Sequence, residues 1–103
     1  MSMAVVLQDE QHQNISELVC DAEGAMAACL RGCADKPSYC LRFIDPYGDT
    51  IFNPLQARVL LSEWDGLLAC FRENHAEALW RTLRFMILSC SENPHTYLRF
   101  IGE

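Results

Sequence analysis

Two short apolar runs at the start of the chain predict a pair of β-strands. Residues 3–7 are apolar, residues 8–14 are polar, and a second run follows in which Ile15, Glu17 and Val19 alternate with Ser16, Leu18 and Cys20. A period of two sends successive side chains to opposite faces of a strand. We therefore expect a hairpin made of 3–7 and 15–20, although its loop contains no glycine.

A short helix is predicted after this hairpin. Asp21 lies where an N-cap residue is expected, Glu23 adds negative charge to the first turn, and Gly32 marks a C-terminal stop. An N-cap carboxylate accepts hydrogen bonds from the free amides of the first turn, and glycine readily adopts the backbone that ends many helices. The helix therefore lies between Asp21 and Gly32.

A second hairpin is predicted around a proline-glycine turn. From Ser38 to Asp45 the side chains alternate between two faces, with Tyr39, Leu41 and Phe43 on one and Cys40, Arg42 and Ile44 on the other. This pattern indicates a strand. Residues 45–49, Asp-Pro-Tyr-Gly-Asp, suit a tight reversal, and residues 50–53 have the β-branched and aromatic side chains of a returning strand.

The following segment predicts an amphipathic helix from Asn53 to about Phe71. Asn53 and Pro54 form a helix start, and Gln56 completes a capping-box pattern. Gly66 weakens the helix by about 1 kcal/mol and marks a point where it can kink. The apolar side chains recur every three or four residues and predict one buried stripe: Leu55, Val59, Leu60, Trp64, Leu67, Leu68 and Phe71.

A second helix and a final strand complete the pattern. Asn74 is a second N-cap candidate with Glu77 three residues later, and Asn93-Pro94 ends the helix. Residues 97–101 predict a strand that echoes residues 40–44. The second helix has its own apolar stripe, in which Trp80, like Trp64, is expected to be core: Leu79, Trp80, Leu83, Met86, Ile87 and Cys90.

These elements predict a single α+β domain over residues 1–103. We expect a mainly antiparallel sheet of about five strands covered by the two C-terminal helices, with the short helix between the two hairpins. So few helices leave a sheet face or an edge strand uncovered. Homodimer formation is a common way to cover such a surface, and we therefore expect a homodimer.

Charge and composition narrow the partners. Fourteen acidic residues against eight basic ones give a net charge of −6, which disfavours nucleic acid and favours a basic protein partner. No apolar stretch approaches the about 20 residues that span a bilayer, and no signal-peptide pattern is seen, so we expect a cytoplasmic protein with no membrane association. The six cysteines then are reduced thiols, mostly in the core, and folding needs no cofactor.

Two segments resemble a known group. FIDPYGDTIFN at 43–53 and the closing YLRFIGE at 97–103 are similar to small bacterial proteins of uncharacterised function that share a DPYGDT(V/I)FN signature followed by Leu-Gln. The resemblance implies an α+β domain and supplies neither an activity nor catalytic residues.

Few side chains suggest site chemistry. Asp45 and Asp49 flank the turn at Tyr47 and could hold Mg²⁺ or Ca²⁺, although turn geometry alone accounts for both aspartates. Cysteines and histidines could bind zinc, but without paired spacing buried thiols are favoured: Cys29, Cys33, Cys40, His12, His75 and His95.

Two arginines are candidates for interaction, together with Tyr47. Arg42 and Arg99 are predicted on comparable faces of one sheet. There they could bind a carboxylate or phosphate, or pair across strands with Asp45 and Glu103, which is the commoner outcome.

No phosphate-binding loop or nucleophile elbow is present in the sequence. We therefore favour a non-enzymatic protein-interaction or regulatory domain, with an immunity-like role against a basic toxin as a special case. The alternative is a small enzyme or divalent-metal-dependent binder that uses Asp45 and Asp49.

Overall fold

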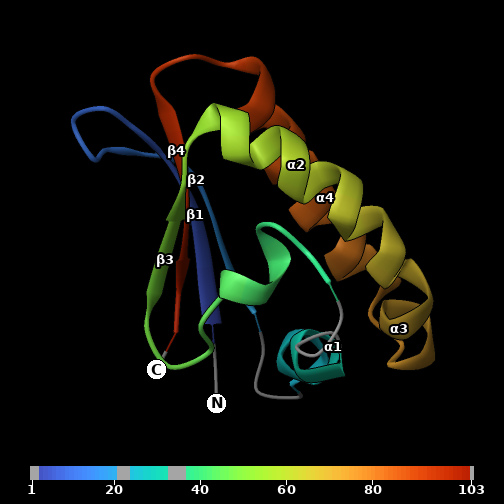
Figure 1. Cartoon of the computed structure of the whole chain (residues 1–103). Coiled ribbons are helices and arrows are strands. Elements are labelled where there is room, and N and C mark those ends of the chain that lie inside the picture. The colour runs from blue at the N-terminus through green and yellow to red at the C-terminus, as the bar shows by residue number, and fades with distance from the viewer. Residues whose placement is uncertain (1–2, 21–23, 33–36, 103) are drawn as a thin grey trace.

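The computed structural model describes residues 3–20, 24–32 and 37–102, and it is an α+β structure. Within these residues the strands form a four-stranded antiparallel sheet in the order β2-β1-β4-β3, and the helices pack on one side of it (Figure 1). The strands are β1 (Met3–Asp9), β2 (Asn14–Cys20), β3 (Asp49–Phe52) and β4 (Thr96–Ile101). The α-helices are α1 (Ala25–Gly32), α2 (Pro54–Trp64), α3 (Leu68–Glu73) and α4 (Glu77–Glu92), and two 3-10 turns are η1 (Leu41–Phe43) and η2 (Asp65–Leu67).

The first hairpin is confirmed. β1 and β2 pair antiparallel with Val5 opposite Leu18, and one register shift follows Leu7. The loop needs no glycine because His12 takes the left-handed conformation (φ 64°) and Asp9 Oδ1 accepts hydrogen bonds from two backbone amides of the turn. A short carboxylate that bonds nearby amides is a common substitute for turn glycines.

The strand predicted for Ser38 to Asp45 is wrong, and so is the second hairpin. This segment folds into η1 and its flanks, where the buried residues are Cys40, Leu41 and Ile44. β3 instead pairs with β4, Phe52 lying opposite Leu98. The sheet therefore has four strands in the described residues rather than about five.

The predicted start of α2 is confirmed, whereas its predicted length is wrong. Asn53 Oδ1 accepts from the backbone N–H of Gln56, and the Gln56 side chain accepts from the N–H of Asn53, both at 2.9 Å. The helix then tightens into η2 around Gly66 before it continues as α3. This interruption falls at Gly66, the position that the sequence marked as a weak point of the helix.

The predicted N-cap at Asn74 is also wrong. Asn74 closes α3, where its Nδ2 donates to the carbonyl of Cys70 at 2.8 Å, and Ala76 precedes α4. His75 between them has φ 57° and makes the reversal possible. Glu77 does not reach back to a cap, because Arg72 and Arg81 bind its carboxylate.

The core lies between the sheet and the helices. Both tryptophans are buried, as expected, and so are Cys29, Cys40 and Cys90. The predicted burial is wrong for two members of the apolar stripe of α2, since Leu55 is 67% exposed and Val59 is 37% exposed. α2 packs on the sheet through Ala57, Leu60 and Trp64, a narrower stripe than the one predicted.

None of the described helices lies over the other face of the sheet, as expected for a fold with so few helices (Figure 1). On this face Val6 lies between Glu17 and Arg99 of the neighbouring strands and is only 3% exposed. None of the described helices is long and apolar enough to cross a membrane. Asp21, Glu23, Cys33 and Glu103, which entered the sequence predictions, lie outside the described residues.

Candidate functional site

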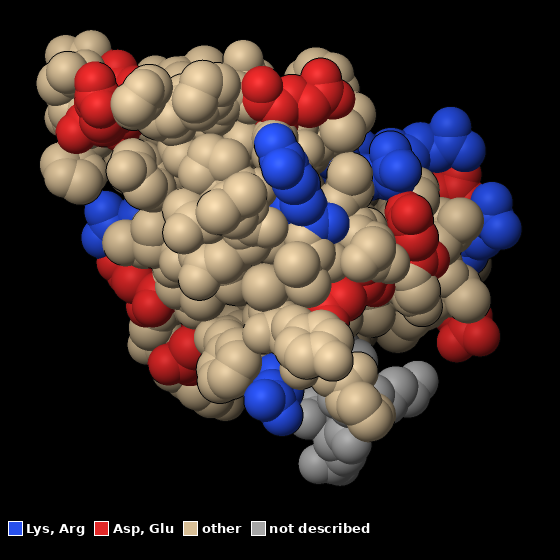
Figure 2. Space-filling model, turned by 45° about the horizontal axis from the view of Figure 1, so that its top comes forward, with Lys and Arg blue, Asp and Glu red and all other residues tan. Residues whose placement is uncertain are grey.

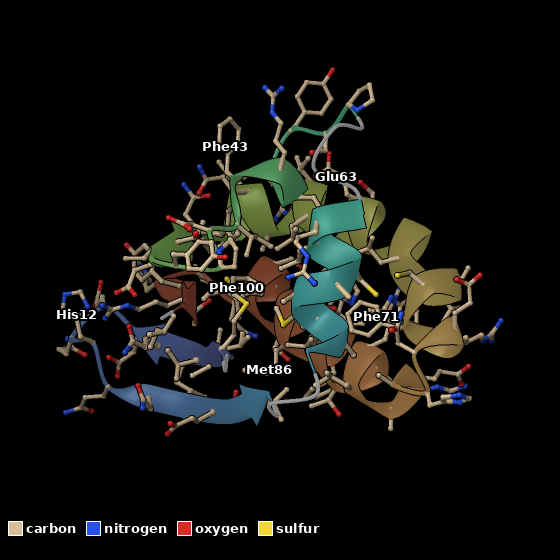
Figure 3. The ribbon with its side chains drawn as sticks, turned by 90° about the horizontal axis from the view of Figure 1, so that it is seen from below. His12, Phe43, Glu63, Phe71, Met86 and Phe100 are labelled. Carbon is tan, nitrogen blue, oxygen red and sulfur yellow. The ribbon has the colours of Figure 1, made fainter. Side chains whose placement is uncertain are left out.

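The carboxylate of Glu63 organises the segment that precedes and forms η1. It accepts hydrogen bonds from the backbone N–H groups of Tyr39 (2.6 Å), Cys40 (3.0 Å) and Leu41 (2.9 Å). In Figure 3 Glu63 extends from α2 toward this segment. A single side chain of α2 thus satisfies three amides that would pair with a neighbouring strand if the segment were extended.

Electrostatics match this geometry. Burial raises the pKa of Glu63, but the three backbone hydrogen bonds and the charge of Arg42 lower it by more, so the net pKa lies below the ordinary value of 4.5. Hydrogen bonds that stabilise the ionised form favour it over the neutral acid. Glu63 is therefore a charged anchor near neutral pH.

The anchored segment presents aromatic side chains to solvent. Tyr39 is 82% exposed and Phe43 is 59% exposed, and Phe43 points away from the interior in which Phe71 and Phe100 lie (Figure 3). The guanidinium of Arg42 lies over the ring of Phe43, 4.9 Å from its centroid. The aromatic rings are therefore displayed on a held backbone rather than on a free loop.

α2 extends this surface. Its exposed residues Leu55 and Val59 are one turn apart, and η1 lies beside the same helix, since the Sγ of Cys40 is 3.5 Å from the carbonyl oxygen of Gln56. We call the surface formed by Tyr39, Phe43, Leu55 and Val59 the apolar face. In the view of Figure 2 a broad stretch of the surface carries few charged side chains.

The turn at 45–48 lies beyond η1. Asp45 Oδ1 accepts from the N–H of Tyr47 at 2.8 Å, and Thr50 Oγ1 donates to the carbonyl of Phe43 and accepts from the N–H of Asp45. The phenol of Tyr47 is left 71% exposed. The turn chemistry predicted from the sequence is confirmed, whereas the extended arm that should lead into it is absent.

The structure separates the two arginines that the sequence placed on one sheet. Arg99 lies on β4 and binds Asp49 of β3, with Nε 3.1 Å from Oδ2. Arg42 belongs to η1 and is not in the sheet, so the predicted shared sheet face is wrong. A cross-strand ion pair forms, as expected, but Asp49 rather than Asp45 is the partner of Arg99. Glu103, the other predicted partner, lies outside the described residues.

The proposed metal ligands are held by other groups. The carboxylate of Asp45 bonds within its own turn, and that of Asp49 binds Arg99. In the part of the chain that the structure describes, no three His, Cys, Asp or Glu side chains gather closely enough to hold a metal ion. The three histidines lie in separate turns with positive φ: His12, His75 and His95.

Glu63 and all four residues of the apolar face were missed by sequence reasoning as site residues. Leu55 and Val59 fit the apolar period of a helix, and only the tertiary packing decides which side of that stripe stays open. The single signal for Glu63 was a charged residue between Leu60, Leu61 and Trp64 on the apolar side of α2. Such a residue is usually explained as an edge of the stripe.

Comparison of the chain with protein-family models, with curated proteins and with solved structures gave no match.

Proposed function

We propose that this chain is a protein-interaction or regulatory domain that binds a protein partner through the apolar face. The observation that supports this most is the exposure of four large apolar side chains on two adjacent elements, Tyr39, Phe43, Leu55 and Val59. Exposure of apolar surface to water is unfavourable, and clusters of such surface mark sites where another surface is buried.

The anchoring by Glu63 also supports an interface. Aromatic residues are enriched among the side chains that contribute most to binding. Their contribution is reduced when a loop must be ordered on association. Because Glu63 already fixes the backbone of Tyr39 through Leu41, that ordering is largely complete in the free protein.

Net charge bears on the partner. The charge of −6 favours a partner with basic groups. Binding of such a partner would serve regulation, and neutralisation of a basic toxin is a special case of the proposed function.

Site-directed photocrosslinking in the native host tests the proposal. A photoreactive phenylalanine analogue is placed at Phe43 and, as a matched control, at Phe85. Phe85 is 69% exposed, belongs to α4 and lines a different groove, which it shares with Ile15. We expect a discrete crosslinked protein from position 43 and none, or a different one, from position 85. Purified partner should then bind the Phe85→Ser variant normally and the Tyr39→Ser/Phe43→Ser variant at least ten-fold more weakly.

Equal crosslinking from both positions, or equal binding by both variants, would show that the apolar face is not the interface. Light scattering of the pure protein tests the predicted homodimer separately. If a dimer forms, its dissociation by the Tyr39→Ser/Phe43→Ser variant would make the second copy the partner.

A further inference from the structure

The arginines of this chain are unequally paired. Most of them have an acceptor, but the guanidinium groups of Arg31 and Arg42 have no salt bridge or hydrogen-bond acceptor among residues 3–20, 24–32 and 37–102. Acidic residues outnumber basic ones in the sequence. The paired arginines are Arg72 and Arg81 with Glu77, Arg84 with Asp65, Arg99 with Asp49, and Arg58 with the carbonyl of Ser91.

Arg31 and Arg42, the two arginines without an acceptor among the described residues, line the same cavity. This pocket of about 380 Å³ lies between the C-terminal end of α1, which contributes Arg31, and the η1 segment, which contributes Arg42. Its volume falls at the lower end of the range of small-molecule sites. α1 and η1 lie next to each other in both ribbon views (Figures 1 and 3).

The walls of the pocket are apolar. They come from Leu30, Leu41, Ile44 and Pro46, and the ring of Phe43 stands at the pocket with Arg42 over it. A pocket lined by apolar groups with a few charged ones binds an apolar body and orients it through its polar end. The two guanidinium groups define that polar end as anionic.

We propose that this pocket binds a carboxylate carried on a small apolar group. A guanidinium presents paired N–H donors that fit the two oxygens of a carboxylate. Asp45 also lines the pocket, and its negative charge disfavours a doubly charged phosphate more than a singly charged carboxylate. The ligand is either a free aromatic or aliphatic acid, or the C-terminal carboxylate of a peptide that ends in an apolar residue.

This inference goes beyond the proposed interaction function and does not depend on it. Arg42 and Phe43 border both the pocket and the apolar face. The pocket can nevertheless be tested with small molecules and no protein partner. Failure of one proposal therefore leaves the other standing.

Titration of the isotopically labelled protein, followed by amide NMR, is the test. The probe is 3-phenylpropionate, and 3-phenylpropionamide is its neutral match. We expect shifts confined to residues 30–31 and 41–46, with a dissociation constant on the order of 1 mM for a probe of this size. The amide should bind at least about ten-fold more weakly, since it lacks the charge that the arginines select.

Two variants assign the charge selectivity to the pocket. Arg42→Gln should weaken binding of the acid about ten-fold and leave binding of the amide unchanged, whereas Arg81→Gln, which removes the same charge from α4, should change neither. Phenyl phosphate should bind more weakly than the acid. Equal binding of acid and amide, or shifts that avoid residues 30–31 and 41–46, would overturn the proposal.

A peptide arm separates the two sources of carboxylate. Short peptides that end in phenylalanine are compared with a free and with an amidated C-terminus. If the free-carboxylate peptide binds more tightly than 3-phenylpropionate, the ligand is a peptide terminus. If the free acid binds and the peptide does not, the pocket is a site for a small carboxylic acid.

Discussion

Trp64 and Trp80 donate hydrogen bonds to each other's backbone. The indole Nε1 of Trp64 donates to the carbonyl oxygen of Trp80 at 3.2 Å. The indole Nε1 of Trp80 donates to the carbonyl oxygen of Trp64 at 2.9 Å. Both residues are buried, and the exchange joins the end of α2 to the first turn of α4. It satisfies two large donors in the core, where an unpaired N–H would be costly.

Replacing one tryptophan should therefore remove more than packing. In Trp80→Phe the carbonyl of Trp64 loses its indole donor, and we expect the free energy of unfolding to fall by about 1–3 kcal/mol, plus the loss of buried area. Urea unfolding measures it. The control is Leu83→Val, a buried change on α4 that removes no hydrogen-bond donor. Its free energy of unfolding should be about 1 kcal/mol lower than that of the native protein. Equal losses would argue against a role for the indole hydrogen bond.

Glu63→Gln should loosen the aromatic segment without unfolding the protein. The side-chain amide can still accept at one atom, but its NH₂ group would face a backbone N–H that now bonds Oε1 or Oε2. We expect a stability loss of about 1–3 kcal/mol. Hydrogen exchange should rise most at Tyr39, Cys40 and Leu41. Glu73→Gln, an exposed glutamate of α3, should leave those three amides protected.

The contribution of Glu63 should depend on pH in one direction. Its pKa in the folded state lies below 4.5, so the stabilisation is fully present above the unfolded pKa and is lost as pH falls through the folded pKa. Unfolding of the native protein and of Glu63→Gln at several values between pH 7 and pH 2.5 should show a stability difference that shrinks on acidification. A stability difference that stays constant with pH would show that the ionised form of Glu63 is not the source of the stabilisation.

Two glycines should respond oppositely to alanine. A Cβ at Gly102 would clash with the carbonyl oxygen of Pro46, whereas a Cβ at Gly66 would meet nothing within 4 Å. Gly102→Ala should therefore destabilise the protein and weaken the contact of β4 with the 45–48 turn. Gly66→Ala should stabilise it by about 0.5–1 kcal/mol, since the substitution restricts the unfolded chain. Thermal unfolding of both variants checks the pair, and a shift of the same sign in both would refute it.

Divalent metal provides a direct check on the alternative function. Because Asp45 bonds its own turn and Asp49 binds Arg99, we expect millimolar Mg²⁺ or Ca²⁺ to leave the melting temperature unchanged. A ligand that binds only the folded state raises it. A rise that disappears in Asp49→Asn would restore the metal-site hypothesis.

Several local patterns predicted the local structure correctly, although the one that suggested an N-cap at Asn74 did not. The hairpin of β1 and β2, the capping box at Asn53 and the end of α4 before Pro94 each depend on neighbouring residues, and each is found. The segment from Ser38 to Asp45 is different. Its alternation is compatible with a strand, but its backbone amides donate hydrogen bonds to the carboxylate of Glu63, which lies more than twenty positions away in the sequence. Contacts of that sequence separation leave no local trace.

The candidate site shows the same division. Arg42 and Tyr47 could be selected from the sequence as exposed interaction residues. The apolar face could not, because Leu55 and Val59 follow the period of a buried stripe and only the position of η1 and the sheet determines their exposure. The pocket could not be predicted either, because it forms between α1 and η1, and no sequence pattern indicates that these two elements lie side by side.

The order of strands in the sheet also determines when the protein can finish folding during synthesis. β3 pairs only with β4 in this sheet, and β4 is the last element of the described chain. β1 and β2 can pair early, but β3 has no strand beside it, and β1 lacks its second neighbour, until β4 has left the ribosome. Nascent chains that stop before Thr96 should therefore expose the unpaired edge of β1 and recruit chaperones.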